Sequence, residues 1–433
     1  MKTIFRSTIA TLLFAAIMAL GAAATFAQDP CADAEGIAKL DAQIRELLPK
    51  KGVDQNEADR RSAISLSKQF LEKYGACEST KEFSTYLTAA VPKLEKRLAD
   101  YLAGIEKNKM IDRFNTGIKG KNWDEVYAAG KDLLAKYPDE FRVVEVVMGS
   151  IGLDETQKSP RVTKWNDETI RYAKASIADL EAGKLKDFGV KPFIYLNKDD
   201  AIAWMNYTIG YILTYDKNNK KEAAPFLYKA AQASASETRN DPVVYQAIGV
   251  YYFDTAKVLI KEYKDLVDSQ KATDTDEVKQ QKVDAIKAKG GMLNGTVERA
   301  LDAYSRAWAL AKSTTPAEKT YRDGLYKTIS DLYNVRFEKL DGLEAWVKAV
   351  PAKPMPDPTS AVTPVIDPEP ATTSTTTPPT TTPAATPAKP ATTVIKPTTG
   401  KPQSVITDTA RSSDTTAAVK APAKAIAKKK GTR

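Results

Sequence analysis

The chain has 433 residues, a formal net charge of +9, two cysteines and no histidine. Histidine-dependent triads, histidine metal sites and histidine proton shuttles are therefore excluded, and two cysteines cannot build a cysteine-rich metal cluster. After residue 350, eleven Lys and Arg stand against five Asp and Glu, so the positive charge belongs mainly to the C-terminal tail.

Residues 1–27 have the pattern of a signal peptide. Two positive residues precede an apolar stretch over residues 9–20, and Thr25-Phe26-Ala27 ends the segment. A cleaved signal is favoured over a membrane anchor, because this stretch is short and polar residues follow it. No later stretch is long and apolar enough to span a bilayer. We expect an exported protein that is periplasmic, associated with the cell envelope, or secreted.

Residues 28–106 are predicted to form an N-terminal helical region. Amphipathic patterns over residues 32–48 and 55–76 predict two helices joined by a turn that contains Pro and Gly. An antiparallel hairpin brings Cys31 and Cys77 to the same end, so a disulfide is predicted for an oxidising compartment. Two free thiols, or a lipid attached to Cys31, are the alternatives.

The helical pattern continues from residue 79 to residue 119. Pro92 interrupts it, and we expect a new helix to begin near Ala90 with the proline in its first turn.

Helix–turn–helix units follow one another between residues 107 and 350. An early helix begins at Asn122 and is ended by Pro138. Residues 141–152 form an apolar run whose length favours a buried helix over a strand. After a longer connection, residues 201–252 hold two helices and the start of a third.

These units resemble tetratricopeptide repeats (TPR), in which small residues let helices approach and larger ones fill the space between them. Trp123 and Pro138 have the spacing of the second helix of such a repeat, and Tyr245 begins a first-helix pattern. The resemblance implies an all-α, right-handed solenoid of helical hairpins over residues 107–350. The residues predicted to pack the repeats are Trp123, Pro138, Ala223, Leu227, Ala230, Ile248, Gly249, Ala300, Tyr304 and Ala307.

One repeat is predicted to be split by an insertion. Its first half ends at Tyr252 and its second half begins at Ala300, so 47 residues intervene. The insertion, about residues 253–291, is charged and is predicted to form two helices, the second of which stops at Gly290-Gly291. It is either a solvated helical arm that lengthens the array or an arm specific for a partner.

The last helical pair, residues 316–350, is expected to cap the array. From residue 351 to residue 433, Pro, Thr and Ala dominate and the end is rich in Lys, which predicts a disordered tail. The tail is either a spacer or a cationic tether to an anionic polymer of the cell envelope. Binding to nucleic acid is not expected, because the Lys cluster lacks interleaved aromatic residues.

The resemblance implies a non-catalytic scaffold that binds a peptide or a partner domain on the concave face of the array. Tyr207, Tyr211, Tyr245, Tyr251 and Tyr252 are the predicted partner surface, although Tyr245 and Tyr252 also suit packing between helices. Acidic pairs lie at predicted helix starts, where they stabilise unpaired N–H groups, so no catalytic residue, metal or cofactor is expected. The alternatives are a structural envelope protein held by its basic tail, and a protein that captures a solute in its groove.

Overall fold

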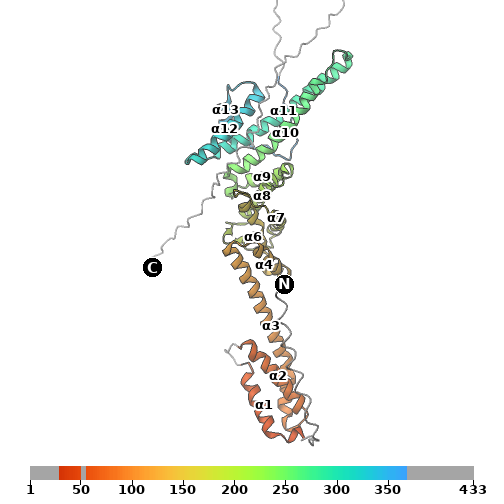
Figure 1. Cartoon of the computed structure of the whole chain (residues 1–433), viewed down its shortest axis with the longest axis vertical. Coiled ribbons are helices and arrows are strands. Elements are labelled where there is room, and N and C mark those ends of the chain that lie inside the picture. Colours follow the sequence, from red (N-terminus) through yellow and green to blue (C-terminus); the bar gives the residue numbers. More distant parts are fainter. Residues whose placement is uncertain (1–28, 50–54, 368–433) are drawn as a thin grey trace, which may run out of the picture. The chain divides into compact units, whose positions relative to one another are not determined.

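The computed structural model describes residues 29–49 and 55–367. In these ranges the chain is helical apart from loops and one pair of very short strands, which confirms the all-α prediction (Figure 1). The chain divides into two compact units, residues 1–113 and 114–433, and each is described by itself. The predicted signal peptide and the tail from residue 368 lie outside the described residues. No described helix has the length and apolar character that crossing a membrane requires.

The first unit is a helical hairpin packed on the start of a long helix. Its elements are η1 (Pro30–Ala32), α1 (Ala34–Leu47), α2 (Glu57–Tyr74), η2 (Glu78–Thr80) and the first part of α3 (Lys81–Gly120). The predicted hairpin of residues 32–48 and 55–76 is confirmed. Its core holds Ile44, Phe70, Tyr74 and Leu87, all nearly inaccessible to solvent.

The predicted helix start near Ala90 is wrong, because α3 is continuous through Pro92. Proline removes one backbone donor and crowds the preceding turn, at a cost of about 3 kcal/mol in a helix interior. Pro92 is exposed, whereas Val91 and Leu94 beside it are buried. Their burial against the first unit offsets that cost and holds the helix on both sides of the proline.

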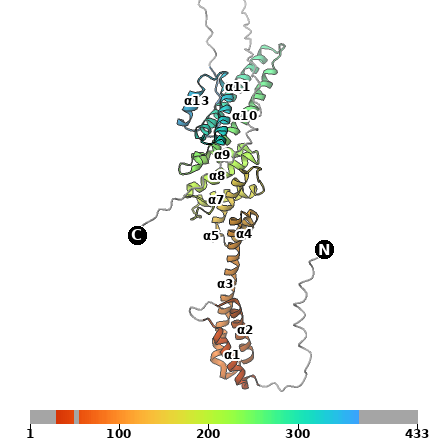
Figure 2. The same ribbon diagram turned by 60° about the vertical axis from the view of Figure 1, so that its left-hand side comes forward.

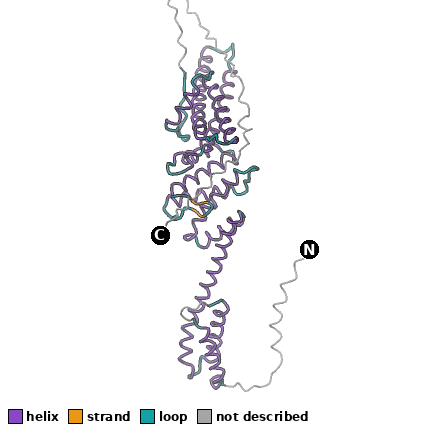
Figure 3. Tube along the Cα trace, turned by 90° about the vertical axis from the view of Figure 1, so that its left-hand side faces the viewer, coloured by secondary structure: helices purple, strands orange, loops and turns teal. Residues whose placement is uncertain are grey.

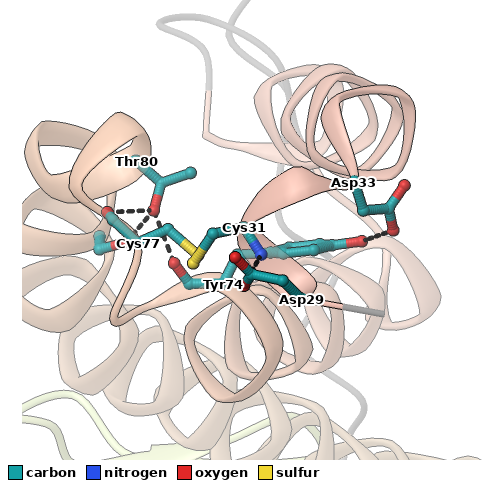
Figure 4. Close-up of a disulfide and its surroundings, with 7 residues drawn as sticks. Asp29, Cys31, Asp33, Tyr74, Cys77 and Thr80 are labelled. Carbon is teal, nitrogen blue, oxygen red and sulfur yellow. Dashed lines mark hydrogen bonds between the residues drawn. A yellow bond between two sulfur atoms is a disulfide. The ribbon is translucent and has the colours of Figure 1, made fainter. Parts of the chain in front are cut away.

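A disulfide joins Cys31 to Cys77, with their Cα atoms 5.3 Å apart, so the predicted pairing is present in the structure (Figure 4). Beside it, the hydroxyl of Tyr74 donates to the Asp33 carboxylate at 2.5 Å, and Lys73 donates to the same oxygen at 3.0 Å. The Tyr74 hydrogen bond, followed by the Lys73 ammonium, lowers the pKa of Asp33 to about 2. These contacts fasten the beginning of the described chain to the end of α2.

The second unit is a succession of helices that pack on their neighbours in sequence. Consecutive helices form the hairpins α6–α7, α8–α9 and α10–α11, and α6 also packs on α8. The succession from α7 to α11 can be followed in Figure 2. A shared hydrophobic core runs through these helices. The helices are α4 (Trp123–Lys136), α5 (Pro138–Phe141), α6 (Val143–Thr156), α7 (Asn166–Glu181), α8 (Lys198–Tyr215), α9 (Lys220–Gln232), η3 (Glu237–Asn240), α10 (Pro242–Asp268), α11 (Asp276–Leu310), α12 (Pro316–Phe337), α13 (Leu343–Ala349) and η4 (Val350–Ala352).

The longer connection between α7 and α8 forms a small antiparallel hairpin. Strands β1 (Gly189–Val190) and β2 (Phe193–Ile194) pair with each other and pack on α6 (Figure 3). The next residue, Tyr195, shares a hydrogen bond of 2.7 Å with Ser150 of α6. The connection therefore covers part of α6 that would otherwise face solvent.

The predicted repeat-packing residues are buried, with one exception. Trp123 is 5% exposed, and its indole N–H donates to Glu155 at 2.6 Å. Small residues lie where helices cross: a Cβ on Gly249 would be 2.8 Å from the Tyr304 ring. The exception is Pro138, which is exposed and begins the short helix α5. Its fixed φ suits a first helical position, so it starts a helix after the turn and does not pack the hairpin.

The predicted insertion is the far end of one long hairpin. The expected helix stop at Gly290-Gly291 is wrong, because α11 runs from Asp276 through both glycines to Leu310. A glycine inside a helix costs about 1 kcal/mol relative to alanine, which packing along α10 outweighs. Residues 257–290 are mostly exposed or half-buried. At their turn, the Lys282 ammonium donates to Ser269 O at 2.6 Å and to Asp274 at 2.7 Å.

The last pair, α12 and α13, is present as predicted. A capping box between Thr315 and Glu318 starts α12. The tail boundary differs from the prediction, because residues 351–367 return along α11 in place of being disordered. We call residues 351–367 the strap. Their proline-rich composition, without aromatic residues, hid this packing, which depends on hydrogen bonds from α11 and α12.

Candidate functional site

The five tyrosines predicted to form a partner surface lie mainly in the core. The prediction is wrong for Tyr207 and Tyr211, and for Tyr245 and Tyr252 the alternative, packing between helices, holds. The exposed fractions of Tyr207, Tyr211, Tyr245 and Tyr252 are 1%, 3%, 7% and 3%. Tyr251 is half-buried and packs its ring 4.9 Å from that of Tyr252. Their side chains fill space between helices.

The tyrosines of α8 belong to a line of packed rings along that helix. Ring centroids are 5.8 Å apart for Trp204 and Tyr207, 5.9 Å for Tyr207 and Tyr211, and 4.6 Å for Tyr211 and Tyr215. Pairs of this kind contribute about 0.5–1.5 kcal/mol each beyond their buried area. Burial raises the pKa of Tyr211 to about 12, because the charged phenolate is disfavoured away from water. The line of rings stabilises the fold and offers little surface to a partner.

Asp241 lies beside this aromatic line. It caps α10 by accepting a hydrogen bond from Val243 N at 2.8 Å, and its carboxylate lies near the Tyr207 hydroxyl. Burial raises the pKa of Asp241, and the Val243 and Tyr207 contacts oppose that rise. Capping the helix accounts for its position.

The strap is held along one face of α11. We call that face the seat, together with Arg336, which contacts the strap, and Tyr252, which contacts Arg299. The strap residues contribute mainly main-chain groups. Val365 N donates to Gly291 O at 2.9 Å, and the Asn294 amide donates to Val365 O at 3.1 Å. The seat comprises Gly291, Asn294, Gly295, Arg299 and Arg306 of α11, Tyr252 of α10 and Arg336 of α12.

Two glycines let the strap approach the helix backbone. A Cβ on Gly295 would lie 2.2 Å from Thr363 O, closer than real Cβ atoms approach any atom. A Cβ on Gly291 would lie 3.2 Å from Pro364. Glycine is therefore required at residue 295 by the bound strap, although it lowers the intrinsic stability of the helix.

Arg299 is the main donor to the strap. Its guanidinium donates to the carbonyls of Asp357 (3.2 Å), Ser360 (2.9 Å) and Ala361 (2.7 Å), and to the Ser360 hydroxyl (3.0 Å). It also contacts the Tyr252 hydroxyl at 3.2 Å. Hydrogen bonds from a charged donor are stronger than neutral ones, so this side chain fixes the middle of the strap.

Arginines also hold the two ends of the strap. Arg306 donates to the carbonyls of Val350 (3.1 Å) and Lys353 (2.7 Å). Arg336 forms a two-bond pair with the Asp367 carboxylate, both at 2.9 Å, and donates to Glu298 at 2.7 Å. Burial lowers the pKa of Arg336, but the two carboxylates outweigh it and raise that pKa overall.

Few strap side chains are buried. Met355 and Pro358 are buried near its beginning and Val362 is half-buried, whereas Ile366 is 68% exposed. Beside its end lies a shallow open depression lined by Asn294, Val335, Arg336, Phe337, Glu338 and Asp367. The hydrophobic contribution to strap binding is therefore concentrated at residues 355–362, and the later residues depend on polar contacts.

The described residues contain no group of three or more Cys, Asp and Glu side chains that could hold a metal ion. The acidic pairs at helix starts make local contacts: Asp200 accepts from Leu196 N at 2.9 Å, and Asp124 accepts from Lys164 and Trp165. Capping and ion pairing account for their positions.

The sequence pattern that marks the seat is present but ambiguous. Gly291 and Gly295 are four residues apart, which places them on one face of a helix, and Asn294 and Arg299 flank that face. The same glycines are also consistent with a helix end. Only when α11 is known to be continuous do these two glycines indicate that another chain segment lies close to the helix backbone.

Comparison with protein-family models, with curated proteins and with solved structures finds no match for this chain. The tetratricopeptide resemblance therefore stays a prediction that rests on the residues of this chain.

Proposed function

We propose that this protein is an exported, non-catalytic scaffold that binds an extended polypeptide or a partner domain on a TPR-like array of helical hairpins. One observation carries the proposal. The array already holds a segment of its own chain, residues 351–367, along α11, through donors that reach main-chain carbonyls. A helical array with this property is suited to binding polypeptide.

Two further features support parts of the proposal. The succession of hairpins α6–α7, α8–α9 and α10–α11 agrees with a repeat array, because each hairpin packs on the next. The disulfide between Cys31 and Cys77 suits an oxidising compartment outside the cytoplasm. The apolar start of the chain adds the signal that export requires.

The test is affinity capture followed by crosslink mapping. The full chain and a form ending at Asp367 are tagged, incubated with envelope extract of the source cells, crosslinked and purified. We expect one protein to be recovered with both forms, to bind the purified chain directly, and to crosslink to residues 114–367. Capture that requires residues 368–433, with no crosslinks to the helices, would instead favour a structural protein held to the envelope by its basic tail.

A further inference from the structure

We propose that the seat is a binding site for an extended, proline-containing segment of a partner protein, and that the strap is its intramolecular competitor. The inference rests on the proposed scaffold function and names the site, the class of ligand and the means of control. The later part of the occupant is extended, because residues 361, 363 and 365 lie opposite residues 299, 295 and 291, one helical turn apart. Before it, residues 357–360 form a turn that Arg299 also holds.

The contacts of the seat favour main-chain recognition. Arg299 reaches three carbonyls and one hydroxyl, and Gly291 and Asn294 together hold both main-chain groups of Val365. Carbonyl groups occur at every residue, so these contacts can be made by any chain of the right conformation. Recognition through main-chain groups gives affinity, and pockets for particular side chains give specificity.

Two features of the seat select among extended segments. At Gly295 the helix backbone and the Thr363 carbonyl are in close contact, so the ligand main chain must lie directly against α11 at this position. Arg336 lies where it forms a two-bond pair with the carboxylate of Asp367, two residues after Val365. A partner segment therefore needs an acidic residue two positions after the residue that pairs with Gly291. Proline before that residue favours the extended conformation and lowers the entropic cost of binding.

The strap is built so that its later part can leave while its beginning stays. Met355 and Pro358 are buried near the start, whereas residues 359–361, 363, 364, 366 and 367 are exposed. Loss of the later part exposes little apolar surface, and water can replace the hydrogen-bond partners of Arg299. A tethered segment has an effective concentration in the millimolar range, so the strap suppresses weak ligands and yields to tight ones.

The experiment measures binding of the strap sequence supplied as a separate peptide. The probe is a fluorescent peptide of residues 359–367, the part of the strap that can leave, followed by anisotropy. The protein is the full chain, either wild type or with the strap weakened by V362D, V365P and D367A. These changes remove a half-buried apolar contact, the Val365 N–H and the Asp367 carboxylate, and leave the seat and Met355 intact.

We expect the strap-weakened chain to bind the peptide at least tenfold more tightly than the wild-type chain. Adding Gly295→Ala to the weakened chain should abolish that binding, whereas Gly324→Ala should not change it. Gly324 is a matched control, because it also lies inside a helix but a Cβ there would meet no atom within 4 Å. A peptide carrying D367A should bind at least tenfold more weakly than the parent peptide.

Several results would overturn the inference. One is that the strap-weakened chain fails to bind the peptide although its helical content and melting temperature match the wild type. Another is that Gly295→Ala leaves the binding of the peptide unchanged. If the wild-type chain forms dimers and these disappear when the strap is weakened, the occupant of the seat is the strap of a second copy of the chain and not a separate partner. Peptide binding at the seat without any captured protein would instead contradict the proposed scaffold function and leave the seat established.

Discussion

Gly295→Ala tests whether the glycine serves the bound strap or is a tolerated defect in a helix. The added Cβ would lie 2.2 Å from Thr363 O and 2.9 Å from a methyl carbon of Val362. Real Cβ contacts are essentially never shorter than 3.0 Å, so the carbonyl must retreat by about 0.8 Å. The atom in the way belongs to the main chain, which cannot move aside as a flexible side chain can.

The free energies involved have opposite signs. Alanine in place of glycine inside a helix stabilises by roughly 0.5–1 kcal/mol, whereas forcing an extra carbon into a packed contact costs about 1–3 kcal/mol. The second is larger, so the strap should detach near Thr363 or the protein should lose stability. At Gly324 the cost is absent, and the same substitution should raise the melting temperature by roughly 1–4 °C.

Hydrogen exchange followed by mass spectrometry measures the strap, and thermal unfolding measures the whole protein. In Gly295→Ala, the amide of Val365, which donates to Gly291 O in the wild type, should exchange faster, while α11 keeps its protection. Gly324→Ala should leave the exchange of the strap unchanged. Unchanged protection at Val365 together with a rise in melting temperature like that of Gly324→Ala would refute the reasoning.

Three further predictions concern the first unit and the aromatic line of the second. Replacing Cys31 and Cys77 by Ser removes a covalent link between two residues that are 46 positions apart in sequence. In the chain-entropy model this should lower the free energy of unfolding by about 4 kcal/mol. Urea unfolding measures that free energy, and an unchanged unfolding midpoint would contradict the prediction. The pKa of Asp33 is lowered to about 2, so the stability that its charged carboxylate contributes is present above its ordinary pKa and is lost as pH falls through about 2. Tyr74→Phe removes the largest cause of the lowered pKa and should raise it, as measured by NMR titration of the carboxyl. A pKa that stays near 2 would count against the Tyr74 contact. Burial raises the pKa of Asp241, so its negative charge lowers the stability of the fold at high pH. Asp241→Asn can still accept a hydrogen bond from Val243 N and should raise the melting temperature by more at pH 7 than at pH 4. A larger gain at pH 4 would show that the reasoning is wrong.

The helical hairpins were predictable because they depend on local patterns. Apolar residues three and four apart identified α1, α2, α8 and α9, and counting from the turn between α1 and α2 placed Cys31 beside Cys77. Both inferences use contacts between segments that are adjacent in sequence, for which periodicity and chain direction suffice.

The aromatic surface was not predictable from the same patterns. The periodicity of α8 shows that Tyr207 and Tyr211 share a face, but it does not show whether another helix covers that face. The neighbouring helices cover it in the folded unit, which leaves both side chains nearly inaccessible. To predict whether a side chain is exposed, one must know which other helices pack against its face of the helix. A single sequence does not show that packing.

The strap was missed for a different reason. Composition predicts disorder for a segment rich in Pro and Thr that has almost no aromatic residues, and residues 351–367 fall within such a segment, because five of them are Pro and none is aromatic. They are nevertheless held, because Arg299, Arg306 and Arg336 donate to their carbonyls and to Asp367. Hydrogen bonds between main-chain groups and distant arginines leave no periodic trace in a sequence, and the glycines that permit them resemble a helix end.

The strap also differs from the rest of the second unit in the sequence distance that its contacts span. The hairpins join helices that follow each other directly, whereas Arg299 reaches Ser360 across 61 positions and Asn294 reaches Val365 across 71. Contacts between distant residues form slowly, because the chain between them must first be ordered. The helices should therefore pack before the strap docks. For that interval in the folding of each new molecule, a partner segment and the strap would compete for an open seat.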